Sequence, residues 1–131
     1  MADFIPFNVS VFRGDGRAIQ FRGWNVGGVP TDITSWTIFH TAKKRIEDSD
    51  NDALIMRDSV NDPTAIVKYD SDAHGFPDSF TVNYLPADTT DMNPRDYEQD
   101  VQIIQGSGAP RTYAFGTLNI KGDVTRRITT A

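Results

Sequence analysis

The stretch RDYEQDVQII, residues 95–104, alternates in chemical character from one residue to the next. One mainly apolar side consists of Tyr97, Gln99, Val101 and Ile103. The other, mainly polar side consists of Glu98, Asp100, Gln102 and Ile104. Because successive side chains of a strand point to opposite faces of its sheet, this pattern predicts a strand with one buried face. The place of Asp100 on such a strand raises the question of whether it serves an active site, a ligand groove or a structural contact.

Short alternating segments of this kind recur along the whole chain, separated by residues that favour turns. We expect strands at residues 4–13, 18–24, 36–43, 64–69, 80–84, 97–104 and 112–120, whereas residues 53–60 fit either a strand or a helical turn. RGDGR (13–17) is expected to close a hairpin between the first two segments, and QGSGAPR (105–111) one between the last two. About seven or eight short strands at this spacing predict an all-β fold, an antiparallel sandwich or barrel, in a single domain over residues 1–131.

The composition agrees with a small globular domain of this class. The chain has 131 residues, of which 38% are hydrophobic and 11% aromatic, so it can bury one core. Nearly all acidic residues are Asp, which favours turns, and only Glu47 and Glu98 are Glu. The chain contains no cysteine, which excludes disulfides, thiolate zinc sites and a cysteine nucleophile.

The charge and hydropathy patterns restrict the classes of partner that the chain is expected to bind. The formal net charge is -5, and the basic residues cluster only at positions 43–45 and 126–127, so no nucleic-acid partner is expected. The N-terminus lacks the pattern of a secretory signal, and no apolar run approaches the roughly 20 residues of a transmembrane helix. We therefore expect a soluble chain that has no membrane partner.

Two Asp-rich stretches are candidates for ion binding. In YDSDAHG (69–75), Asp70, Asp72 and His74 would share a face of a strand, a set that could hold a divalent metal, but a solvated turn is the simpler interpretation. DSDND, from Asp48 to Asp52, resembles the start of a calcium loop. An EF-hand requires Gly at the sixth position and Glu at the twelfth, where this chain has Ala and Ser. The EF-hand is excluded, a different calcium site stays open, and we predict an acidic turn and no cofactor.

Signs of catalysis are weak. There is no G-x-S-x-G elbow, and Ser107 lies in a glycine-rich turn. Paired carboxylates of the glycosidase type stay open because a sequence contains no distances. The Arg-Gly-Asp tripeptide in RGDGR is explained by the needs of a tight turn. We therefore predict that the chain is not an enzyme. Trp24 and Trp36 could form a sugar-stacking platform, although Trp36 is more simply a core residue.

Five segments, in the order SWTIFHTAKK, DSDNDALI, ADTTDM, YEQDVQII and TYAFGTLNIKGDVTR, are more informative as a set. Together they resemble a family of small phage-encoded tail and baseplate proteins. The pattern of that family is W-x-I-x-F-T-x-K, an Asp-rich loop ending in D-A, a D-T step, Y-x-x-D-V-Q, and T-x-x-x-G-x-L-x-I-x-x-D-V-T-R. These elements fall on residues 36–43, 48–53, 88–89, 97–102 and 112–126, within a resemblance that covers residues 30–127.

The resemblance implies an immunoglobulin-like β-sandwich of seven to eight strands, similar to the N-terminal module of phage baseplate upper proteins. It implies a phage or prophage virion structural protein, located in the tail after assembly in the host cytoplasm. Its partners would be other tail or baseplate proteins and further copies of itself in an oligomer. The family has no catalytic residues to transfer. Two departures are His40, which interrupts the F-T step, and the end of the chain soon after Arg127, because of which direct host recognition is not expected.

These considerations also suggest an answer about the opening stretch. We expect Tyr97, Val101 and Ile103 to pack the sandwich. Asp100 and Gln102 should face a neighbouring strand or subunit. A buried Asp100 would need a cationic partner, either Lys43 or Arg126. The structural or interface candidates are Trp36, Lys43, Tyr97, Asp100, Val101, Gln102 and Arg126.

The chain ends offer another contact. Residues 1–6 and 122–131 could form terminal arms, with the apolar residues Phe4, Ile5 and Phe7 reaching a neighbour, although an ordinary edge strand explains the N-terminal residues equally well.

Two other function classes remain open. A carbohydrate-binding sandwich would present exposed aromatics, such as Trp24 or Tyr113, beside Asp and Asn. A metal-dependent hydrolase would use Asp70, Asp72 and His74.

Overall fold

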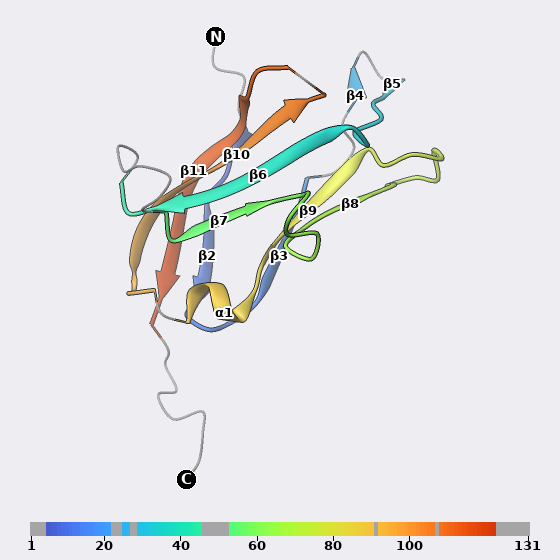
Figure 1. Ribbon diagram of the computed structural model, residues 1–131. Helices are drawn as coiled ribbons and strands as arrows, with labels where there is room; N and C mark the ends of the chain where they lie inside the picture. Colours follow the sequence, from blue (N-terminus) through green and yellow to red (C-terminus); the bar gives the residue numbers. More distant parts are fainter. Residues whose placement is uncertain are drawn as a thin grey trace.

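The computed structural model describes residues 5–21, 25–26, 29–45, 53–90, 92–106 and 108–122. These residues form short strands joined by turns, with one helix of a single turn (Figure 1). The strands are β1 (Ile5–Pro6), β2 (Val9–Phe12), β3 (Arg17–Phe21), β4 (Asn25–Val26), β5 (Val29–Pro30), β6 (Trp36–Lys43), β7 (Ile55–Asp58), β8 (Ile66–Tyr69), β9 (Ser79–Tyr84), β10 (Arg95–Gln105) and β11 (Arg111–Lys121), and the helix is α1 (Pro86–Thr89).

The strands form two packed sheets. The large sheet has the order β1-β11-β10-β6-β7, with β2 also pairing with β11, and the small sheet has the order β3-β9-β8. Strands β3, β6, β7, β8, β9, β10 and β11 therefore occupy the B, C, C′, D, E, F and G positions of an immunoglobulin domain, in sheets G-F-C-C′ and B-E-D. The prediction of an all-β, immunoglobulin-like sandwich is confirmed. The described strands outnumber those predicted because β1, β4 and β5 are only two residues long.

The predicted hairpin around RGDGR is wrong. Strand β2 runs parallel to β11 in the large sheet, whereas β3 pairs with β9 in the small sheet, so the turn between them crosses from one layer to the other. The apolar residues of both strands can thus enter the core from opposite sides. The sheets are consequently not purely antiparallel, since β1 and β2 both run parallel to β11.

Other local predictions agree with the structure. The hairpin of β10 and β11 forms as expected, with Gly106 at a φ of 60° in its turn. Residues 53–60, for which strand and helical turn were both open, contain β7. The segment between β9 and β10 contains α1, which begins at Pro86, a residue suited to the first turn of a helix.

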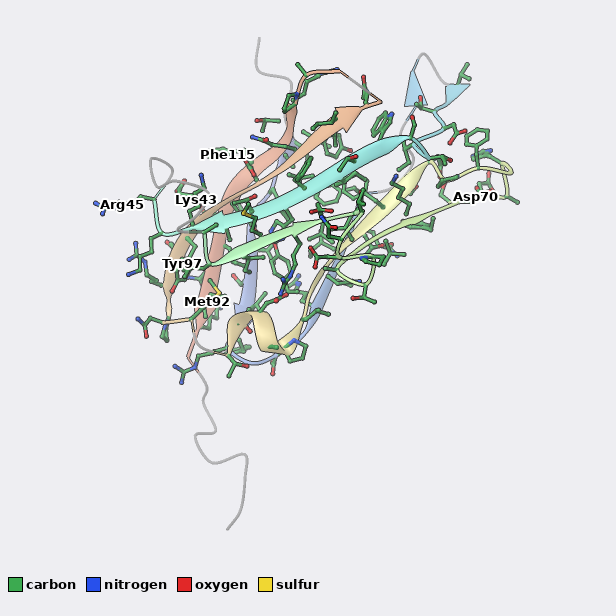
Figure 2. The ribbon with its side chains drawn as sticks, viewed as in Figure 1. Lys43, Arg45, Asp70, Met92, Tyr97 and Phe115 are labelled. Atoms are coloured by element: carbon green, nitrogen blue, oxygen red, sulfur yellow. The ribbon has the colours of Figure 1, made fainter. Side chains whose placement is uncertain are left out.

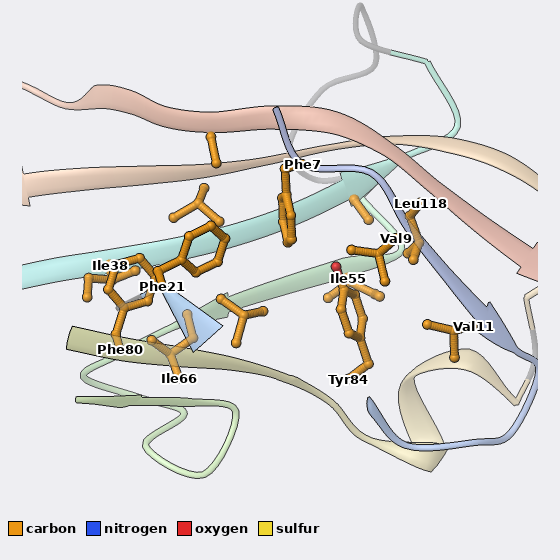
Figure 3. Packing of buried hydrophobic residues seen from close by; sticks show 14 of the residues in the cluster. Phe7, Val9, Val11, Phe21, Ile38, Ile55, Ile66, Phe80, Tyr84 and Leu118 are labelled. Atoms are coloured by element: carbon orange, nitrogen blue, oxygen red, sulfur yellow. The ribbon is translucent and has the colours of Figure 1, made fainter. Parts of the chain in front are cut away.

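The core lies between the two sheets and is filled largely by alternate residues of the longer strands (Figure 3). Tyr97, Gln99, Val101 and Ile103 are all at most 2% exposed, as the alternation of the opening stretch predicts. Trp36 is also buried, in agreement with its assignment to the core rather than to a sugar platform. The hydroxyl of Tyr97 donates a 2.7 Å hydrogen bond to the carbonyl of Asn93, which is the tyrosine corner of immunoglobulin-like domains.

The N-terminal residues that the structure describes belong to the sandwich itself. Ile5 lies beside Ala114 in the parallel pair of β1 and β11, which fits the alternative of an edge strand, and Phe7 is buried in the core. Phe4 and residues 123–131 of the second possible arm, including Arg126, lie outside the described residues.

Candidate functional site

The outer face of the large sheet presents three adjacent rows of side chains across its central strands. Directly opposed residues of neighbouring strands share a face, so the strand register defines these rows. The first row is Lys43, Glu98 and Thr117; the second is Met56, Thr41, Asp100 and Phe115; the third is Asp58, Phe39, Gln102 and Thr112. We call these residues the outer face. It combines both signs of charge with apolar and hydroxyl groups.

The centre of the outer face is slightly hollowed. Thr41, Lys43, Glu98, Asp100, Gln102 and Phe115 line a depression of about 90 Å³, together with Gln99. Lys43 extends from the last residue of β6, and Phe115 lies on β11 (Figure 2). Pockets that enclose small ligands measure roughly 300–1,000 Å³. The depression is too small to enclose a sugar or a cofactor, but it suits a side chain of a protein partner.

Asp100 is half-buried at the middle of the outer face. Its neighbours across the strands are Thr41 and Phe115, and Gln102 Nε2 donates to Asp100 Oδ2 over 3.4 Å. Lys43 is directly opposite Glu98, one row away from Asp100, and both Lys43 and Asp100 line the depression. A partly solvated carboxylate does not require the buried cationic partner that the sequence suggested, and the other candidate for that role, Arg126, lies outside the described residues.

The inner face of β10 carries a polar group that links the two sheets. Gln99 Oε1 accepts hydrogen bonds from the hydroxyl of Tyr84 on β9 and from His40 Nε2 on β6, the latter over 3.1 Å. Gln99 Nε2 donates to the carbonyls of Phe7, over 3.0 Å, and Thr117, over 3.3 Å. Gln99 follows the corner tyrosine by two residues, where antibody domains place a disulfide cysteine. In this cysteine-free chain, the bond between Gln99 and Tyr84 connects the sheets there.

His40 is neutral in this cluster. Burial lowers its pKa to about 4, although the hydrogen bond with Gln99 acts in the opposite direction. Because Gln99 Oε1 can only accept, the neutral ring carries its proton on Nε2. Burial also raises the pKa of Tyr84. His40, Tyr84 and Gln99 are all sealed in the core, so they act as structural groups and not as a reactive site.

The D-T step at positions 88–89 also has a structural explanation. The Asp88 carboxylate is buried and forms an ion pair with Arg57 of β7, and it accepts a 3.1 Å hydrogen bond from the backbone N–H of Leu85. The hydroxyl of Thr89 accepts a 2.9 Å hydrogen bond from the backbone N–H of Gly14. These bonds attach α1 to β7 and to the turn between β2 and β3.

The predicted metal candidates lie in a loop rather than on a strand. Asp70 accepts hydrogen bonds from the backbone N–H groups of Asp72, His74 and Gly75 over 3.2, 2.9 and 2.8 Å, and the bond from His74 is the largest cause of its lowered pKa. His74 Nε2 is 3.5 Å from Asp78 Oδ2. Within the described ranges, no three His, Asp or Glu residues are grouped to hold a metal ion. The candidate loop from Asp48 to Asp52 lies outside those ranges.

Tyr113, one of the aromatic candidates for a sugar platform, is half-buried and lines a hollow of about 360 Å³. An irregularity in the pairing of β10 with β11 after Val101 turns Tyr113 inward, where its ring packs 5.6 Å from that of Phe21 and 5.7 Å from that of Phe80. Burial raises the pKa of Tyr113 to about 12. Trp24, the other aromatic candidate, lies outside the described residues.

The alternation in the sequence places Asp100 and Gln102 on one polar face, but it does not identify the residues of other strands that lie beside them. Met56, Thr41 and Phe115 complete the outer face through strand pairing that no local pattern reveals. The sequence signals of the buried cluster were polar residues on otherwise apolar sides, Gln99 in one strand and His40 beside Trp36 and Ile38 in another.

Comparisons with known proteins give no family for this chain. No protein-family model matches the sequence, and no curated protein matches it significantly. Among the described residues, no helix has the length and apolar character required to cross a bilayer.

Proposed function

We propose that this chain is a non-enzymatic structural protein of a phage or prophage virion, a tail or baseplate assembly module that acts through protein–protein contacts. The observation that supports this function best is the outer face of the large sheet, which is chemically mixed, slightly hollowed and borne on hydrogen-bonded strands. The motif resemblance supplies the context of the virion tail, and the partners would be other tail or baseplate proteins and further copies of the chain.

The chemistry of the outer face is that of an interface between proteins. Met56 is 52% exposed, and Phe39 and Phe115 are half-buried, so apolar surface remains that a partner can cover. Charged groups lie beside it, as in non-obligate interfaces, which are about as polar as the rest of a protein surface. Strand positions also hold side chains in fixed places, which reduces the ordering cost of association.

The proposal is tested on the full chain by light scattering after gel filtration, alone and mixed with the purified products of neighbouring genes. We expect a discrete assembly of fixed stoichiometry that contains at least one neighbouring gene product. Saturable quenching of tryptophan fluorescence by a sugar, without any assembly, would instead identify a carbohydrate-binding module and overturn the proposal.

A further inference from the structure

We infer that the outer face of the large sheet is the docking surface for a second copy of this chain, in a face-to-face dimer with two-fold symmetry. This inference rests on the proposed function and specifies one of its contacts. In the inferred dimer, the large sheets of the two copies face each other. The two-fold axis lies in the plane between these large sheets, parallel to the strands and midway between β6 and β10.

The strand order determines which side chains meet about this axis. The axis lies in the middle of the four strands β7, β6, β10 and β11, so β6 of one copy covers β10 of the other, and β7 covers β11. Positions along the strands are unchanged by the rotation. Each row of the outer face therefore lies on the same row of the second copy, in reversed order.

The first row becomes electrostatically complementary in this arrangement. Lys43 and Glu98 are opposite one another within a chain, so the rotation places Lys43 of each copy over Glu98 of the other. The four charges then alternate in sign around the axis. An alternating network of this kind is more favourable than an isolated exposed ion pair.

The second row is complementary in its apolar and polar groups. Met56 and Phe115 are at its two ends, so each methionine meets the phenylalanine of the other copy, a favourable contact between sulfur and an aromatic ring. Thr41 meets Asp100, and its hydroxyl can donate to the carboxylate. Aligned sheets cross at about 30°, so the match is best close to the axis.

A second copy suits the outer face better than a partner of one charge sign. Glu98 and Asp100 would repel an acidic partner, and Lys43 would repel a basic partner. The same chain presents both halves of each contact, which is the requirement of an isologous interface.

The test uses charge reversal and mixing, followed by sedimentation equilibrium of the full-length chain. Lys43→Glu and Glu98→Lys each place like charges across the interface, and we expect each alone to raise the dimer Kd by about 10-fold or more. Mixing the two variants should restore dimers with a Kd within about threefold of wild type, because the changed position 43 of one meets the changed position 98 of the other.

Mixing separates the intermolecular contact from effects within one chain. In both variants the cross-strand pair inside each chain still has like charges after mixing, so a merely structural defect would not be repaired. Lys44→Glu is the matched control because it makes the same charge change at an exposed residue outside the three rows. Circular dichroism of every variant should show the wild-type fold.

The outcomes have distinct meanings. A wild-type chain that is monomeric at about 0.1 mM overturns the inferred dimer. So does equal weakening by Lys44→Glu, or failure of the folded variants to recover on mixing. None of these results affects a complex with neighbouring gene products, which tests the proposed function. Conversely, a dimer that recovers on mixing supports the inference even if those gene products do not bind.

Discussion

Replacing Gln99 with Leu should be the most damaging conservative change in the core. Leucine has a similar volume, so the substitution removes hydrogen bonds without opening a large cavity. It leaves the Tyr84 hydroxyl, the His40 Nε2–H and the carbonyl of Phe7 without the partner that Gln99 provides. A buried polar group that has lost its hydrogen-bond partner costs about 1–3 kcal/mol of stability, and burial of the added apolar surface of leucine contributes about 1 kcal/mol in the opposite direction.

At the lower end of this range the three groups together cost about 4 kcal/mol, so we expect a net loss of about 3 kcal/mol in the free energy of unfolding, out of a total of about 5–15 kcal/mol for a domain. For a chain of 131 residues this corresponds to a decrease in Tm of about 10 °C. Urea unfolding followed by tryptophan fluorescence measures the change in stability, since Trp36 is buried in the folded state. The slope of the free energy against urea should stay constant.

Two further variants make this prediction refutable. Gln105→Leu is the same substitution at an exposed position of β10 and should change stability by no more than about 0.5 kcal/mol. The double variant Tyr84→Phe, Gln99→Leu should lose at least about 1 kcal/mol less stability than the sum of the losses of the two single variants. The reason is that Tyr84→Phe removes the hydroxyl that Gln99→Leu leaves without a hydrogen-bond partner. Equal effects of Gln99→Leu and Gln105→Leu would show that the buried bonds contribute nothing.

Three other substitutions test the groups around this cluster. Burial lowers the pKa of His40 to about 4, so between pH 6.5 and 4 this side chain is protonated in the unfolded chain but neutral in the folded chain. The free energy of unfolding should therefore fall by up to about 3 kcal/mol as the pH decreases from 6.5 to 4. His40→Gln should flatten this dependence in urea titrations at several pH values, and an unchanged slope would exclude His40 as its source. Gly116→Ala would place a Cβ against the backbone carbonyl of Phe7, so amide hydrogen exchange should show that β1 has separated from β11. Gly122→Ala adds a Cβ that makes only ordinary contacts, so the amides of β1 should stay protected in that variant. Arg57→Met removes the ion-pair partner of the buried Asp88 carboxylate, so thermal unfolding should show a loss of stability of about 2 kcal/mol. Adding Asp88→Asn to Arg57→Met should recover part of that loss. The absence of any recovery would contradict the contribution of the ion pair.

The fold class follows from local patterns in the sequence, but the chain path does not. Alternation predicted β6 at its actual ends and the buried side of β10 residue by residue. The same alternation in β2 and β3 suggested a hairpin, and the structure separates these strands into different sheets. Both arrangements bury the same apolar residues, so the pattern alone could not distinguish them.

The candidate site was predictable in part. Asp100 and Gln102 could be assigned to a polar face from their spacing, and Lys43 was associated with them as a cation. In the register, Lys43 is directly opposite Glu98, and Asp100 is directly opposite Thr41 and Phe115. Register between strands depends on long-range pairing, which a single sequence does not display.

The sequence by itself determined which side of strands such as β6 and β10 faces inward, because that property has a period of two residues and is local. It also determined that no thiol chemistry occurs, since the chain contains no cysteine. Only the tertiary structure decided that Gln99 joins the two sheets and that Lys43, Glu98, Met56 and Phe115 share one surface. Those relations arise when strands distant in the chain pair at one particular register, and that register depends on the packing of the whole core.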